Sequence, residues 1–164
     1  MKRVILASLL VLAASFLTVN LVNAKELSDE QKVAISATCV NAQSNLQRLG
    51  SSDTTTRINR GRDYDQILKL FYAMNTRVAS NNITEPKLAE VTKNFENELA
   101  RFRDNYNSYN DQLKTTIDFG CASNPQGFYD TLESTRARRA NLNTNITKLH
   151  NLIEDYQLIV KGLL

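Results

Sequence analysis

The chain has 164 residues, with 20 Lys and Arg against 17 Asp and Glu, and a formal net charge of +3. Lys2 and Arg3 supply two of those charges, so the rest of the chain holds 18 basic and 17 acidic residues. A nucleic-acid binder needs a clear basic surplus, so this near balance argues against one. Apolar residues make up 42% of the chain and charged ones 23%, which favours a globular protein over a disordered one.

Residues 1–24 have the pattern of an export signal. The basic pair at the start precedes an apolar run over 4–19, and Val22 and Ala24 stand where a signal peptidase expects small or branched residues. We therefore expect cleavage after Ala24 and a single helical domain over 25–164. The short signal is typical of bacteria, so we expect the protein to be secreted, on the cell surface or in the periplasm. We expect attachment to the membrane only if the signal is uncleaved, because no later apolar run approaches the ~20 residues of a membrane helix.

Two cysteines, Cys39 and Cys121, lie in the expected mature chain. An oxidising compartment favours a disulfide between them, since nothing else in the chain can pair with either. The alternative is a reactive thiol, but no Cys-x-x-Cys motif is present and no His or Arg flanks either cysteine. We predict a structural disulfide.

The first half of the mature chain predicts two helices. The first runs over Ser28–Leu49, where Ser28 and Gln31 form a capping box and Gly50 ends the helix. A polar connection follows, and the second helix starts near residue 54 or 63 because Gly61 interrupts it.

The second half predicts a hairpin of two long helices. The third helix starts near Thr84 and runs to Ile117, and the fourth follows Asn124, with Pro125 at its first position. Their apolar residues recur at intervals of three and four, as in a coiled coil. We expect an all-α antiparallel bundle of about four helices dominated by this hairpin. The alternative is an extended hairpin with shorter helices packed along it.

Pairing the two long helices across their short link predicts two stacked pairs. Arg139 then faces Tyr106, and Arg136 faces Tyr109. A guanidinium stacked on a tyrosine ring can bury its stem and keep its head hydrogen-bonded. The alternative is that both arginines simply extend to water.

The sequence lacks the residue sets of common enzymes and metal sites. There is one His and no Glu-x-x-His motif, which argues against di-iron and zinc centres. Met74 and His150 are of the ligand types that bind haem, but core packing and an exposed histidine explain them better. The close acid pairs point to different sides of a helix and indicate solvated faces. We expect no enzyme activity, no metal and no cofactor.

Two basic clusters are candidates for contact with a partner or an anion. The first contains Arg57, Arg60 and Arg62, and the second contains Arg136, Arg138 and Arg139 on the fourth helix. Either could bind an anionic polymer, a phospholipid head group or an acidic protein. The alternative is an ordinary solvated face, because acids are interspersed among these residues.

Two short segments resemble known groups of exported proteins. The segment from Leu27 to Gln31, Leu-Ser-Asp-Glu-Gln, is similar to the Leu-Thr-x-x-Gln motif of Spy-like periplasmic chaperones, although the capping box also explains it. Residues 121–156 combine Cys, Asn-Pro-Gln-x-Phe-Tyr, Arg-x-x-Arg and Leu-Ile-x-x-Tyr. That combination resembles small secreted helical proteins of unknown function from Saccharibacteria-type (patescibacterial) genomes.

These observations predict a non-enzymatic helical protein that acts by protein–protein contact or as an envelope scaffold. Its partner would be an envelope or extracellular protein, and it could also form a homo-oligomer because the last helix offers more apolar seam than the first two can cover. The alternatives are a Spy-like chaperone and a small-ligand-binding bundle.

Overall fold

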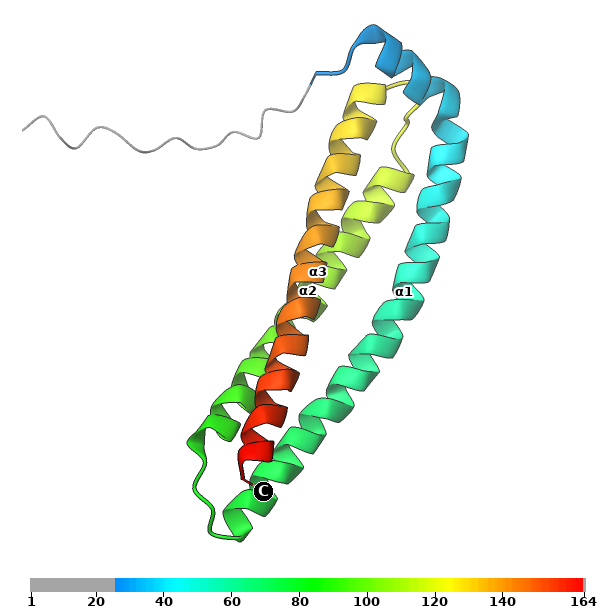
Figure 1. Cartoon of the computed structure of the whole chain (residues 1–164). Coiled ribbons are helices and arrows are strands. Elements are labelled where there is room, and N and C mark those ends of the chain that lie inside the picture. Colours follow the sequence, from blue (N-terminus) through cyan, green and yellow to red (C-terminus); the bar gives the residue numbers. More distant parts are fainter. Residues whose placement is uncertain (1–25, 164) are drawn as a thin grey trace, which may run out of the picture.

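The computed structural model describes residues 26–163, and the predicted export signal lies outside them. Three helices follow one another along the chain: α1 over Asp29–Ser80, α2 over Pro86–Ile117 and α3 over Pro125–Gly162. No strand occurs within the described residues. None of these three helices combines the length and hydropathy of a membrane span. The elongated bundle is shown in Figure 1.

The prediction of four helices is wrong, because α1 runs unbroken through Gly50 and Gly61. A glycine inside a helix costs about 1 kcal/mol relative to Ala, which packing along a long helix can outweigh. The polar residues of the expected connection are accommodated in the helix. Thr54 and Thr55 each donate a side-chain hydrogen bond to the carbonyl four residues earlier. With no proline between Asp29 and Ser80, nothing in this stretch forces the chain out of helical geometry.

α2 and α3 form the predicted antiparallel hairpin and lie side by side in Figure 1. Asn124 caps α3 by accepting a hydrogen bond from the Gly127 amide at 3.0 Å. The cap of α2 is Glu85, one residue later than the expected Thr84. Most of the apolar residues that recur at intervals of three and four along α2 are buried, namely Leu88, Phe95, Leu99, Phe102, Tyr106, Tyr109 and Leu113.

Polar side chains buried inside the hairpin fix its alignment. The Asn145 amide donates to the Glu98 carboxylate at 2.6 Å and accepts from the Asn105 amide at 2.7 Å. Farther along, the Thr116 and Thr135 hydroxyls share a hydrogen bond of 2.8 Å. A slip of α3 against α2 would leave these buried groups without partners, which disfavours other registers.

The predicted disulfide joins Cys39 of α1 to Cys121 in the connection between α2 and α3. Next to it, the Gln43 amide donates to the carbonyls of Ile117 and Phe119 at 2.9 and 3.0 Å. Phe128 packs against the disulfide in a small apolar cluster of its own. One end of α1 is thereby tied to the hairpin covalently and by hydrogen bonds.

Candidate functional site

α1 and α3 are the most loosely packed of the three helix pairs. α1 packs mainly against α2 and meets α3 at few points, whereas α2 and α3 pack closely. Three side-chain bridges span the face between α1 and α3, and hollows lie between and beyond them. We call this face, from Asp53 to Arg77 on α1 and from Arg139 to Lys161 on α3, the α1–α3 seam.

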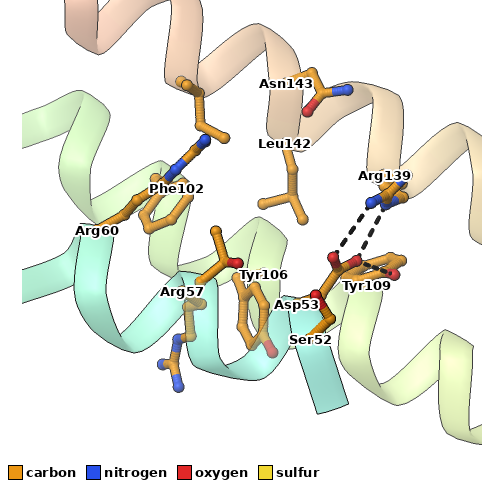
Figure 2. Close-up of a pocket in the computed structure, with 12 residues that line it drawn as sticks. Ser52, Asp53, Arg57, Arg60, Phe102, Tyr106, Tyr109, Arg139, Leu142 and Asn143 are labelled. Carbon is orange, nitrogen blue, oxygen red and sulfur yellow. Dashed lines mark hydrogen bonds and ion pairs between the residues drawn. The ribbon is translucent and has the colours of Figure 1, made fainter. Parts of the chain in front are cut away.

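The first bridge is an ion pair that also engages a buried tyrosine. The Asp53 carboxylate accepts from Arg139 Nε at 3.1 Å and Nη2 at 3.2 Å. It also accepts from the Tyr109 hydroxyl at 2.7 Å, as Figure 2 shows. Burial, followed by the adjacent Asp53 carboxylate, raises the pKa of Tyr109 well above its usual value. The hydrogen bond to Asp53 is the main cause that raises the pKa of Arg139. Both groups therefore keep their protons throughout the physiological range.

Two aromatic bridges follow along the seam. Tyr64 Oη lies 3.2 Å from His150 Nε2, and burial raises the pKa of that tyrosine. Beyond it, the Tyr156 hydroxyl donates to the Asn75 side chain at 2.7 Å. The rings of Tyr156 and Phe71 stack with their centroids 3.7 Å apart. These contacts hold α3 against α1 at intervals and leave the intervening surface accessible.

A groove of about 330 Å³ opens between the first two bridges (Figure 2). Phe102 and Tyr106 of α2 form its floor, and Arg57 and Arg60 line it from α1. The Arg57 guanidinium lies 4.6 Å from the centroid of the Tyr106 ring, within the range of a cation–π contact, and donates to the Asn107 side chain of α2 at 3.5 Å. The Arg60 side chain makes no hydrogen bond or ion pair with any residue in 26–163. We call this feature the arginine groove.

A second hollow, of about 450 Å³, lies beyond the third bridge and is mostly apolar. Leu70 and Met74 of α1 and Val160 of α3 line it, and Leu70 is 66% exposed. Arg77 and Lys161 stand at its edge, and neither has an ion-pair partner within the described chain. We call this feature the apolar hollow.

The structure brings together only part of the two predicted basic clusters. Arg57 and Arg60 share the arginine groove with Arg139. Arg62 donates to Asn59 at 2.8 Å and lines a separate hollow between α1 and α2. The second cluster is dispersed, because Arg136 pairs with Glu133 on its own helix and Arg138 donates to Ser108 of α2.

The structure shows other partners for the residues of the two expected stacked pairs. Tyr106 lies under Arg57, while Tyr109 and Arg139 both bind Asp53. The physical reason is that α1 continues over the hairpin, so a third helix supplies partners that a two-helix pairing omits. Asp53 was missed as a site residue because it was expected in a connecting loop.

The two residues considered as haem ligands lie at different levels of the seam. His150 is opposite Tyr64, whereas Met74 is ten residues farther along α1, which corresponds to about 15 Å. They therefore do not face a common iron site. Residues 26–163 also contain no group of three His, Cys, Asp or Glu side chains placed to hold a metal.

The search for relatives gives no further information on the site. No family model, curated protein or solved structure matches the chain, so the seam has to be interpreted from its own geometry.

Proposed function

We propose that this chain is an exported, non-enzymatic helical protein that acts by contact with another envelope or extracellular protein. The observation that carries this proposal is the α1–α3 seam. There, a groove lined by Arg60, whose side chain has no carboxylate partner within residues 26–163, lies on the same face as an exposed apolar hollow. Exposed apolar surface bordered by charged groups is typical of protein-binding sites on a soluble protein.

The chemistry of the seam supports binding rather than catalysis. Asp53 is engaged by Arg139 and Tyr109, and His150 is engaged by Tyr64. A catalytic site needs a nucleophile or an acid beside a base with room for a substrate at both. The titratable groups of the seam instead pair with one another across two helices, where they stabilise the bundle.

The frame around the seam is also suited to presenting a fixed surface. The disulfide holds one end of α1, and the stacked Phe71 and Tyr156 rings hold it near the other. Little reorganisation would then be needed when a partner binds, which favours affinity. The disulfide between Cys39 and Cys121 supports the proposed export, because disulfides persist in oxidising compartments.

The test is crosslinking and affinity capture of the tagged, full-length protein from its native cell envelope. A variant with Asn143→Trp fills the groove from an exposed position, and Asn97→Trp on the exposed outer face of α2 is the matched control. We expect one dominant partner, at near-equal amount, with the wild type and the control but not with Asn143→Trp. Capture of many unrelated proteins would support a chaperone. Equal capture by both variants would refute the seam as the binding surface.

A further inference from the structure

A hollow of about 470 Å³ lies between α1 and α2, and basic side chains of both helices line it. They are Arg57, Arg62 and Lys69 of α1 and Arg103 of α2. Figure 2 shows the Arg57 side chain pointing away from Arg60, and its guanidinium donates to Asn107 of α2 at 3.5 Å. We call this feature the Gly61 hollow, after the glycine among its lining residues.

The protein leaves most of the positive charge of the Gly61 hollow uncompensated. Arg57 and Arg62 each donate a hydrogen bond to the side-chain oxygen of an asparagine, which carries no charge. The Lys69 side chain forms no hydrogen bond or ion pair within residues 26–163. Of the four basic groups, only Arg103 pairs with a carboxylate of the described chain, that of Asp65 at 2.5 Å. The remaining three cations give the hollow a positive field that attracts anions.

Gly61 leaves the surface of α1 bare between two of these cations. At about 100° per residue, position 61 falls between Arg57 and Arg62 around the helix. Packing does not require a glycine there, because a Cβ would meet nothing within 4 Å, whereas a Cβ at Gly50 would lie 3.3 Å from Leu113 Cδ2. A glycine inside a helix lowers stability, and glycine is common where a backbone and a ligand approach closely. The hollow therefore has room for an anion against the helix at this point.

The charge and the lining of the hollow favour a phosphate ester over a carboxylate. A phosphate monoester carries a charge of about −1.5 to −2 at pH 7 and three acceptor oxygens, whereas a carboxylate carries one charge and two oxygens. Two guanidinium groups and an ammonium group match the larger charge. Ile58, which is 56% exposed, and Phe102 also line the hollow and offer apolar surface to the organic part of an ester.

We propose that the Gly61 hollow binds the phosphate group of an organic phosphate ester. Arg57 and Arg62 flank the phosphate, Lys69 adds to the field that holds it, and the organic part lies against Ile58. The ester is either a soluble molecule or the head group of a phospholipid, since both present the same chemistry to the hollow. This site goes beyond the proposed function, because it needs no protein partner at the α1–α3 seam.

The experiment is a titration of the isotope-labelled, disulfide-bonded protein with glycerol 3-phosphate at neutral pH and constant ionic strength, followed by the NMR shifts of its amides. We expect saturable shifts centred on Gly61. R62Q/K69Q should weaken binding about tenfold or more, because the phosphate loses two cationic partners. The control R136Q/R138Q removes the same charge from exposed positions on α3 and should stay within about twofold. No saturable shift at Gly61, or equal weakening in both variants, would overturn the inference.

Two further variants separate binding from folding. Gly61→Leu places a side chain in the hollow and replaces glycine with a better helix former, so binding should weaken about tenfold or more while urea unfolding shows no loss of stability. Asp65→Asn removes the carboxylate in the hollow, and binding should tighten about twofold or more because the phosphate is no longer repelled. Unchanged affinity in Gly61→Leu, weaker binding in Asp65→Asn, or acetate that binds as tightly as glycerol 3-phosphate would overturn the inference.

Vesicles of phosphatidylglycerol, with phosphatidylcholine vesicles as the control without net charge, distinguish the two sources of the ester. Binding of both glycerol 3-phosphate and phosphatidylglycerol vesicles, lost in R62Q/K69Q, would assign a phospholipid head group. Binding of glycerol 3-phosphate alone would assign a soluble ester. Vesicle binding without glycerol 3-phosphate binding would overturn the inference, because the protein would then recognise a charged surface and not a phosphate group at Gly61.

Discussion

Replacement of Asp53 by alanine tests how α1 is held on the hairpin. The carboxylate accepts three hydrogen bonds, two from Arg139 and one from Tyr109. Arg139 has a side chain that is 48% exposed, so its ion pair contributes at most about 1 kcal/mol. Tyr109 is only 1% exposed, and a hydrogen bond from a buried hydroxyl to a charged acceptor contributes about 1.5–3 kcal/mol.

The net effect also includes helix propensity. Asp53 lies inside α1, where alanine is favoured over aspartate by about 0.5 kcal/mol. We therefore expect Asp53→Ala to lower the free energy of unfolding by about 2 kcal/mol. The matched control is Asp65→Ala on the same helix, which removes a half-exposed ion pair with Arg103 and no tyrosine contact. It should change stability by less than about 0.5 kcal/mol.

The measurement is urea unfolding followed by circular dichroism at neutral pH. A double-mutant cycle of Asp53→Ala with Tyr109→Phe separates the tyrosine contribution, and the coupling should be about 1–2 kcal/mol. Equal losses for Asp53→Ala and Asp65→Ala, or a coupling near zero, would refute the reasoning that the buried tyrosine depends on this carboxylate.

Three further predictions concern the stability of the three-helix bundle. Reduction of the Cys39–Cys121 disulfide opens a loop of 82 residues, and unfolding with and without reductant should differ by about 4 kcal/mol in the chain-entropy model; no difference would contradict its stabilising role. Gly61→Ala should raise stability by about 0.5–1 kcal/mol because a Cβ there meets nothing within 4 Å. Gly50→Ala should gain less, because its Cβ would lie 3.3 Å from Leu113 Cδ2; thermal melts that rank the two the other way would refute this packing. Burial raises the pKa of Tyr109 above its ordinary 10.0, so the unfolded chain loses that proton first and stability falls as the pH rises above 10.0. Urea midpoints from pH 9 to 11 should fall less steeply in Tyr109→Phe, and parallel slopes would contradict the assignment.

The hairpin and the Asn124 cap of α3 could be predicted because their signals are local. Intervals of three and four between apolar residues, and a Pro after Asn124, depend only on nearby sequence. The disulfide followed from counting cysteines in a chain expected to be exported. The continuity of α1 was not predicted because the apolar pattern is interrupted between Leu46 and Tyr64, where glycine and charged residues occupy the inward positions of the helix. The inward positions, which recur at intervals of three and four, include Leu46, Gly50, Asp53, Arg57, Arg60, Tyr64, Ile67, Phe71, Met74 and Val78.

The site was predictable only in part, since it forms where the continuous helix α1 lies over the hairpin of α2 and α3. Arg57 and Arg60 were identified from their clustering, but the sequence did not indicate which of the two basic clusters faces a groove. Asp53 and Asn143 gave no signal of their own, because each is an ordinary polar residue until two helices place it at the groove. The apolar hollow around Leu70 likewise arises where α1 and α3 diverge from close packing.

The most direct test of the account is site-specific photo-crosslinking in cells that produce the protein. A photoreactive amino acid replaces Asn143 in the arginine groove, Gln157 at the apolar hollow, or Asn97 on the outer face of α2. The account predicts the same discrete adduct of one partner from Asn143 and Gln157 and none from Asn97. Adducts from Asn97 alone, or none from either seam position, would contradict the claim that the α1–α3 seam is the surface through which this protein acts.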